Sequence, residues 1–257
     1  MTHTTRFAYI TGICLSLFSA LAWGQDASPQ TAPIQWGVSG GINHYKEPNL
    51  MQLKGPEAGL HARVTHWAEM PNAQFEGDVF LGKQKYTSIN SGSLNNVTNL
   101  ETRWRALVPL FSETASQEGW FSGLAMHTLW NDLRGTTTFQ GTTYGGYQRG
   151  ATQLWLPVRW SSGEMWTIDA GVLIYGRHTS KLSEVNHSYQ DITNTQHGGQ
   201  YAQLSMKLGL SNGDALRPFV RYTHLADSNT VPMGGKNWLE PESDRWQVGA
   251  IWEFAAP

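Results

Sequence analysis

The chain has 257 residues, with 18 Lys and Arg against 20 Asp and Glu and a formal net charge of −2. This balance excludes the basic surface that nucleic-acid binding requires, so we expect no nucleic-acid partner. No stretch after the N-terminal residues approaches the roughly 18 apolar residues that a membrane helix needs. The mean hydropathy of −0.39 does not exclude a protein that crosses a membrane with strands, because strands need apolar residues only at alternate positions.

The N-terminal residues have the pattern of a secretory signal peptide. Arg6 supplies a positive charge, and an apolar run with a few small or hydroxyl residues follows over residues 7–23. Ala22 and Gly24 place small residues at the third and first positions before the expected cleavage site. The run is too short for a membrane anchor, so we expect residues 1–24 to be a signal peptide that is cleaved near Gly24.

The predicted cleavage divides the chain into three parts. Residues 1–24 are the signal peptide, the polar and Pro-containing residues 25–33 are a disordered periplasmic lead-in, and residues 34–257 form the folded part. The single cysteine, Cys14, leaves with the signal peptide. We therefore expect no disulfide, thiol nucleophile or cysteine-based metal site in the mature protein.

Residues 34–257 contain ten short segments in which apolar and polar residues alternate. In the first segment Trp36, Val38 and Ile42 lie on one face, with polar or small residues between them. Alternation of period two is the sequence signature of β-strands. The predicted strands cover residues 34–43, 58–65, 73–81, 101–108, 120–132, 151–160, 165–177, 200–210, 216–225 and 245–254.

The connections between these strands alternate in length. Those after strands two, four, six and eight are short, and those after the odd-numbered strands are long and rich in Gly, Asn, Ser and Thr. Short periplasmic turns and long extracellular loops are typical of outer-membrane barrels. We predict an all-β, up-and-down antiparallel transmembrane β-barrel of about ten strands. Merging or splitting one hairpin would give eight or twelve.

Tryptophan supports this topology. Six tryptophans fall at strand ends that the topology places on the periplasmic side, namely Trp36, Trp67, Trp120, Trp160, Trp166 and Trp252. Aromatic girdles of this kind lie at the headgroup level of the membrane. We expect a multi-pass protein of the Gram-negative cell outer membrane, in contact with outer-membrane lipid, lipopolysaccharide and the barrel-assembly machinery.

Two segments resemble those of known outer-membrane proteins. Trp246–Phe254 resembles the aromatic-ended final strand by which such proteins are recognised for assembly, although Ala255, Ala256 and Pro257 follow the phenylalanine. Residues 131–158 resemble a pattern of small, uncharacterised outer-membrane barrels. The resemblance implies the fold and the location but no activity.

The predicted inward faces carry many charged side chains. They are Arg63, Glu76, Asp78, Glu101, Arg103, Arg105, Arg159, Asp169, Arg177, Lys207, Arg217, Arg221 and Glu253. Opposed residues in an antiparallel ladder have numbers of constant sum, so a register that opposes Glu76 and Arg105 also opposes Asp78 and Arg103. Arg217 and Glu253 would meet near the periplasmic rim. Charges in a confined lumen must be paired, because an unpaired buried ion costs several kcal/mol.

This charge network has two interpretations. It can be a polar plug that holds a small barrel shut, or the lining of a narrow, porin-like channel. Interiors of eight strands are filled by side chains and open porins need about 16 strands, so ten strands favour the plug. Because basic residues outnumber acidic ones in this set, any conductance should prefer anions.

His178 and Ser180 are the catalytic candidates. Extension of the outward phase of strand seven places both on the lipid-facing side near the extracellular rim. The arrangement resembles the His-x-Ser pair of outer-membrane phospholipases and lipid A deacylases. The resemblance implies that His178 is the general base and Ser180 the nucleophile of an outer-leaflet lipid hydrolase. No third catalytic group is assured in this sequence. A polar triplet is also ordinary where a strand enters a loop, so the pair need not be catalytic.

Other candidate chemistry has a simpler explanation. The pair Glu76 and Asp78 resembles the paired acids of outer-membrane aspartyl proteases, but its place opposite two arginines predicts a structural role. The histidines lack metal-ligand spacing, and we expect His61 and His127 to form hydrogen bonds in the lumen. We expect neither a metal nor a cofactor.

Two extracellular loops are the remaining candidates for function. Thr136–Gly150 interleaves hydroxyls, glycines and aromatic rings, and the long loop Ala226–Asp244 carries Val231, Met233, Trp238 and Leu239. Loops that carry apolar side chains are often binding surfaces. The sequence therefore predicts an integral outer-membrane barrel with a structural or surface-interaction role, through an extracellular ligand at its loops. The lipid hydrolase and the anion-preferring channel are the alternatives.

Overall fold

The computed structural model describes residues 34–65, 72–111, 117–138, 141–142, 145–163 and 165–255. The expected signal peptide, its cleavage site, the lead-in and Trp67 lie outside these residues. The described part of the chain is built from β-strands and one short 3-10 helix, η1, at Leu182–Glu184. Within it, no helix is long and apolar enough to cross a membrane.

Fourteen strands are present in the described residues, several of them short. The strands are β1 (Gln35–Glu47), β2 (Met51–Thr65), β3 (Gln74–Ser88), β4 (Gly92–Pro109), β5 (Glu118–Asp132), β6 (Gln148–Ser162), β7 (Trp166–Ser180), β8 (Ile192–Gln196), β9 (Gly199–Met206), β10 (Leu208–Gly209), β11 (Ala215–Leu225), β12 (Val231–Met233), β13 (Lys236–Trp238) and β14 (Ser243–Glu253).

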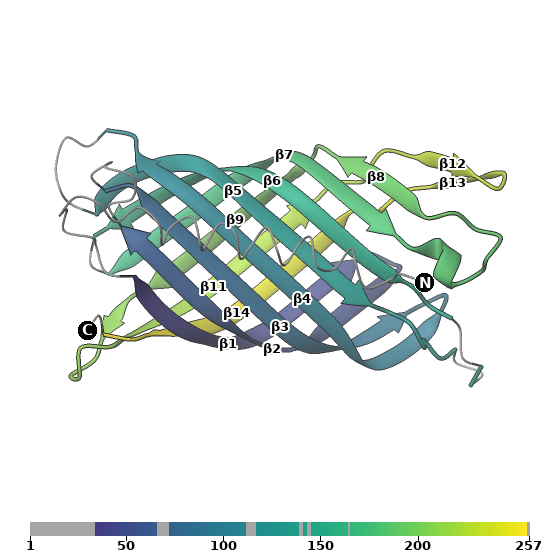
Figure 1. Ribbon diagram of the computed structural model, residues 1–257, viewed down its shortest axis with the longest axis horizontal. Coiled ribbons are helices and arrows are strands. Elements are labelled where there is room, and N and C mark those ends of the chain that lie inside the picture. The colour runs from purple at the N-terminus through teal and green to yellow at the C-terminus, as the bar shows by residue number, and fades with distance from the viewer. Residues whose placement is uncertain are drawn as a thin grey trace, which may run out of the picture. The chain divides into compact units, whose positions relative to one another are not determined.

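These strands form a closed antiparallel barrel (Figure 1). Consecutive strands pair from β1 to β7, β9 pairs with β7 and β11, and β14 pairs with both β11 and β1. The barrel therefore has ten strand positions, as predicted. The eighth position is divided among β8, β9 and β10, while β12 and β13 form a separate hairpin in the loop before β14.

The two ends of the barrel differ in their connections. The first residues of β1 pair with the last residues of β14, so the folded unit begins and ends at one mouth. The connections of residues 133–147, 181–191 and 226–242 lie at the opposite mouth (Figure 1). Because long loops mark the extracellular side of such barrels, we assign this mouth as extracellular and the other as periplasmic.

Two of the predicted long loops are in fact extensions of the strands. Only residues 48–50 separate β1 from β2, and only residues 89–91 separate β3 from β4. In these extensions the inward residues of β2 and β3 remain apolar, as at Leu53 and Tyr86. The neighbouring outward residues, such as Lys54 and Lys85, are polar. We infer that the extracellular ends of these strands extend beyond the lipid, because their outward residues are polar. The hydropathy pattern therefore ends before the hydrogen-bonded ladder does.

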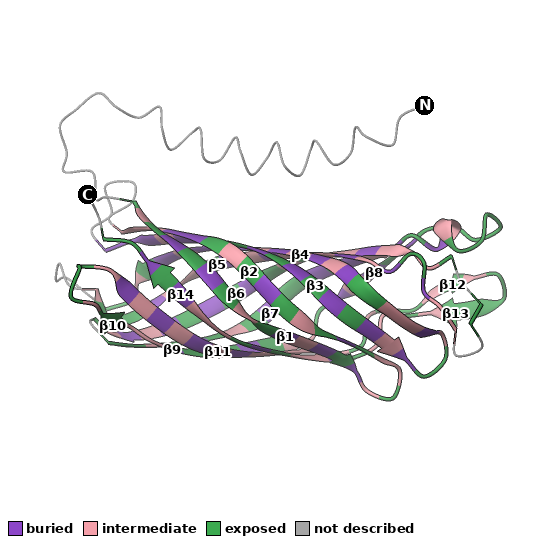
Figure 2. Cartoon of the chain, turned by 90° about the horizontal axis from the view of Figure 1, so that it is seen from below, coloured by how far each residue is buried: buried purple, intermediate pink, exposed green. Residues whose placement is uncertain are grey.

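The outer surface of the barrel is apolar along its middle. Outward side chains from neighbouring strands are exposed there, among them Val38, Ile42, Leu60, Val79, Leu81, Leu124, Leu156, Ile168, Val172 and Val248. Figure 2 shows exposed and buried positions alternating along the strands. Four of the predicted girdle tryptophans, Trp36, Trp120, Trp166 and Trp252, are exposed at the periplasmic strand ends. A closed barrel with an apolar belt and an aromatic girdle is a transmembrane barrel of the outer-membrane type.

A β-bulge in β7 reverses the alternation of its extracellular half. Leu154 of β6 pairs with Tyr175, but Trp155 pairs with Leu173, so Ile174 is an extra residue. Asp169 and Leu173 face inward before the bulge, and the inward positions become even-numbered after it. An inserted residue shifts every later side chain to the other face of the sheet.

This bulge overturns two predictions. Arg177 is exposed on the outside of the barrel and does not belong to the lumen network. His178 and Ser180 are only 6% and 8% exposed and face the interior, not the lipid. Extending the alternation of period two along strand seven gave the wrong faces, because the sequence does not show where a β-bulge inserts an extra residue.

A pair of spin labels can test the bulge. We expect a label at Arg177→Cys in detergent micelles to be mobile and accessible to a water-soluble relaxation agent. A label at His178→Cys should be immobilised, because position 178 lies inside the barrel. Electron paramagnetic resonance of the two folded variants gives the comparison, and the reverse order of accessibility would refute the shifted phase.

Candidate functional site

The periplasmic half of the lumen holds a dense network of ion pairs. Arg159 donates to both oxygens of Glu76, at 2.6 and 2.8 Å, and to Asp169 at 2.7 Å. Glu76 also lies 2.9 Å from Arg105 and 3.5 Å from Arg63. These side chains come from β2, β3, β4, β6 and β7, so the network ties five strands together across the interior.

The predicted register between β3 and β4 is confirmed, although one predicted pair makes other contacts. Glu76 opposes Arg105 and Asp78 opposes Arg103. The Asp78 carboxylate, however, lies 2.8 Å from His61 Nδ1 and accepts a hydrogen bond of 3.3 Å from Arg105. Register places side chains on one face, but rotamers then select among several carboxylates within reach.

Other interior pairs connect the network toward the two mouths. Arg217 and Glu253 meet at 2.8 Å near the periplasmic rim, as expected. In the middle of the barrel Glu101 binds Arg103 at 2.8 Å and also binds Arg245. The amide of Gln247 donates to Glu57 at 2.9 Å.

An aromatic cluster occupies the wall of the lumen formed by β5, β6, β7 and β9. Trp155 is fully buried and its ring lies 5.3 Å from that of Tyr201 and 5.5 Å from that of His127. Ala125 and Leu173 complete this cluster. Apolar residues on the inward face of β5 explain why its sequence does not reveal which side is the lipid side. They also exclude water from part of the interior.

A third group of charges lies under the extracellular mouth. Arg149 donates to Glu47 at 2.7 Å and to Glu240 at 3.3 Å, and its guanidinium lies 4.9 Å from the centre of the Tyr45 ring. Glu240 belongs to the long loop before β14, and its Oε2 lies 3.2 Å from His178 Nδ1. This group therefore fixes an extracellular loop to the barrel wall.

The interior charges are balanced, unlike the set predicted from sequence. Among the described residues, eight basic and eight acidic side chains are buried or nearly so. They are Arg63, Arg103, Arg105, Arg149, Arg159, Arg217, Arg221 and Arg245, with Glu47, Glu57, Glu76, Asp78, Glu101, Asp169, Glu240 and Glu253. The predicted basic excess was wrong, since it included Arg177 and omitted three acids. The balance removes the reason to expect general anion preference.

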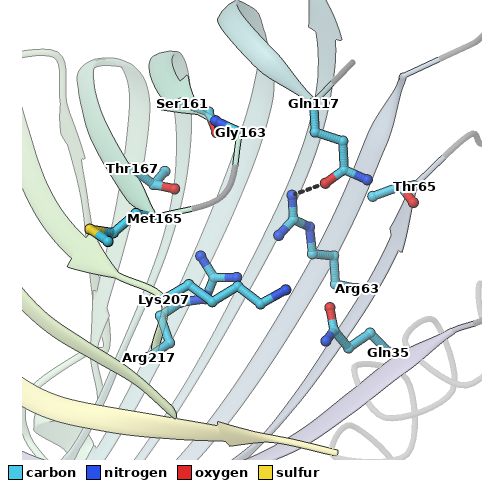
Figure 3. A pocket seen from close by; sticks show the side chains of 10 residues that line it. All are labelled: Gln35, Arg63, Thr65, Gln117, Ser161, Gly163, Met165, Thr167, Lys207 and Arg217. Atoms are coloured by element: carbon cyan, nitrogen blue, oxygen red, sulfur yellow. Dashed lines mark hydrogen bonds between the residues drawn. The ribbon is translucent and has the colours of Figure 1, made fainter. Parts of the chain in front are cut away.

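The periplasmic mouth contains a cavity of about 220 Å³ (Figure 3). Arg63, Lys207 and Arg217 project into it, and Arg63 donates to Gln117 at 3.1 Å. Two of these cations are already paired with glutamates of the lumen network. The cavity ends at that network, where the next enclosed space is only about 20 Å³.

The extracellular mouth contains a larger cavity of about 420 Å³. Arg149, Glu47 and Glu240 supply its charged part, and Ser180 also lines it. Apolar and aromatic side chains from strand ends and loops form most of the remaining wall, including Met51, Tyr86, Leu133, Tyr147, Leu182, Ile192, Trp238 and Leu239. A concave wall that combines apolar and aromatic side chains with convergent polar groups is typical of a ligand site.

Sequence analysis missed five of the functional side chains. Glu47, Glu57 and Arg149 lie on strand segments that were assigned to loops. Arg245 shares the predicted inward face of the last strand with Glu253 but was not counted in the network. Glu240 reaches the lumen from a loop. Arg149 could have been found, because it shares the odd-numbered phase of Arg159 along β6. No group of three or more metal-binding side chains occurs in the described residues.

Comparison of the whole chain gives only distant structural similarities. No protein-family model and no curated protein matches it. The translocator domain of the autotransporter NalP from Neisseria meningitidis is similar over 96% of this chain and 97% of its own, at 12% identity and a TM-score of 0.46. An outer membrane channel from Pseudomonas putida F1 is similar over 90% and 98%, at 10% identity and a TM-score of 0.40.

A third similarity is to the transport unit of the autotransporter AIDA-I from Escherichia coli. It covers 99% of this chain and 100% of that one, at 9% identity and a TM-score of 0.33. Similarities this weak indicate no function for the chain. The assignment to an outer-membrane barrel rests on the closed sheet, the apolar belt and the girdle.

Removal of the central cation of the periplasmic network should destabilise the barrel. We expect Arg159→Met to lower the free energy of unfolding by about 3–5 kcal/mol, because Glu76 and Asp169 would stay buried without their shared partner. Urea titration of the barrel in lipid vesicles measures this loss. Arg177→Met, which removes an exposed charge, is the matched control, and equal losses in both variants would contradict the network.

The seating of the long loop should depend on pH through Glu240. Burial raises the pKa of this loop carboxyl, and the attraction of Arg149 only partly opposes the shift. The seated loop therefore favours the protonated acid. Its stabilisation is full below about pH 4.5 and is lost as the pH rises through the raised pKa. A spin label at Lys236→Cys should therefore become more mobile as the pH rises above the raised pKa of Glu240. Glu240→Gln should remove this dependence of label mobility on pH. Greater mobility on acidification would contradict the sign.

Proposed function

We propose that this protein is a closed outer-membrane barrel that binds an extracellular ligand in the cavity of its loop-bearing mouth. The observation that carries the proposal is the contrast between a filled lumen and an open cavity of about 420 Å³ at one end. The role is surface interaction, as the loops suggest, with the strand ends as part of the site.

Because side chains fill the lumen, we do not propose transport as the main role. Two spaces lined by described residues in the middle of the barrel are about 40 and 20 Å³, much smaller than the cavities at either mouth. Ion pairs span the periplasmic half and an aromatic cluster lines one wall. Opening a path would require several buried pairs to separate together, which is costly in a medium of low dielectric constant.

The loop over the extracellular cavity is held in a defined position, which supports a preorganised site. The Asn194 side chain donates hydrogen bonds to the backbone carbonyl oxygens of Asn229 and Trp238. The backbone N–H of Thr195 donates a hydrogen bond to Asn229 Oδ1. The Trp238 ring lies 6.0 Å from that of Tyr189. A suitable ligand has an apolar part for this wall and a polar or charged group that can reach Arg149 or Glu240.

A fragment screen tests this proposal. Small fragments that combine one charged group with one ring are screened against the purified barrel in micelles by ligand-observed NMR. We expect binders whose signals are lost with Trp238→Ala, because this ring lines the cavity. Asn237→Ala, in the same hairpin, is the control and should retain them. The absence of binders, or equal binding to both variants, would overturn the proposal.

The lipid hydrolase alternative loses its main support in the fold. His178 and Ser180 face the interior, so an acyl chain in the outer leaflet cannot reach them from the lipid side. We expect cells that express wild type or Ser180→Ala at equal levels to have identical lipid A and phospholipids by mass spectrometry. Loss of an acyl chain only with wild type would instead assign a hydrolase to the extracellular cavity.

A further inference from the structure

Arg221 is the exception among the interior cations. It lies on β11, points inward and is 1% exposed. Within the described residues, each of the other seven interior arginines has a carboxylate within 4 Å, whereas Arg221 forms no ion pair. All three nitrogens of its guanidinium also lack a hydrogen-bond partner there.

The surroundings of Arg221 do not neutralise its charge. Its guanidinium lies 4.8 Å from the centre of the Tyr201 ring, on the edge of the aromatic cluster. Arg103, Arg245 and Glu101 line the small cavity beside it, and this carboxylate is already paired with both of these arginines. Guanidinium does not give up its proton in proteins, so the cation cannot escape this environment by becoming neutral.

A small cavity adjoins the free guanidinium. It has a volume of about 40 Å³, and Arg221, Arg103 and His127 are among the residues that line it. The ring nitrogen Nε2 of His127 is buried and has no hydrogen-bond partner among the described residues. The space is enough for a particle of about the size of a water molecule. The Glu101 carboxylate also lines it but is already bound by Arg103 and Arg245. The Arg221 guanidinium and His127 Nε2 are therefore the described groups left without a partner there.

We propose that Arg221 binds a small inorganic anion of the halide type in this cavity. Water could satisfy the donors but would leave the charge unpaired in the interior. A monovalent anion supplies both an acceptor and a counter-charge next to Arg221. Tyr45 and Ser243, which also line the cavity, lie at the extracellular ends of β1 and β14. The site is independent of the ligand cavity proposed above.

Anomalous diffraction tests the site in the unaltered protein. Crystals of the barrel are grown in chloride and soaked in sodium bromide. We expect an anomalous bromide peak in contact with the Arg221 guanidinium. No peak at this place, or an Arg221 side chain that pairs directly with Glu57 or Glu101, would overturn the proposal.

Thermal unfolding tests the same site in solution. The unfolding midpoint of the barrel in micelles is measured in sodium bromide and in sodium gluconate of equal ionic strength. Since a ligand of the folded state stabilises it, bromide should raise the midpoint by a few degrees. Arg221→Gln should lose this rise, and Arg177→Gln, which removes an exposed arginine, should keep it.

Each result of the solution experiment decides the proposal. An equal response of wild type and Arg221→Gln, or no response of the wild type, would refute the site. If Arg221→Gln does not fold, the position of the bromide peak in crystals of the unaltered protein decides the proposal. A negative fragment screen would refute the extracellular ligand cavity without affecting the anion site. A negative bromide experiment would likewise refute the anion site without affecting the ligand cavity.

Discussion

The circumference of ten strands sets the width of the interior, and the other features of this barrel follow from that width. It leaves room for side chains but not for a water-filled pore. Charged residues that face inward are therefore forced into contact with one another, and each requires a partner of opposite charge. Arg159 between Glu76 and Asp169 is the clearest result, because one guanidinium joins carboxylates from two other strands. The same side chains that close the lumen thus hold the wall together.

Confinement also makes any departure from pairing informative. Seven interior arginines have carboxylates, and the eighth, Arg221, faces an aromatic ring and a small cavity. On a surface, an unpaired arginine would need no explanation, since water screens it. In the interior an unpaired ion costs several kcal/mol, and this cost is the reason for proposing a bound anion beside Arg221.

The extracellular mouth differs from the rest of the barrel because the strands there extend beyond the lipid. Their outward faces become polar while their inward faces remain apolar, as at Leu53 and Tyr86. This provides a wall above the plug on which the long loop can rest through Glu240. The bulge at Ile174 adds to the same region, since it turns His178 and Ser180 from the lipid toward the interior.

The sequence by itself determined a count of about ten strands, the antiparallel order, most of the lipid-facing residues and the register of β3 against β4. These follow from a period of two and from loop lengths, which are local properties of the chain. Only the tertiary structure decided where the period breaks at Ile174, which carboxylate each arginine selects, and that Glu240 enters the mouth from a loop. Such features depend on contacts between residues far apart in sequence. A chain that alternates polar and apolar residues specifies two faces, but it does not specify which side chains meet across the space that the faces enclose.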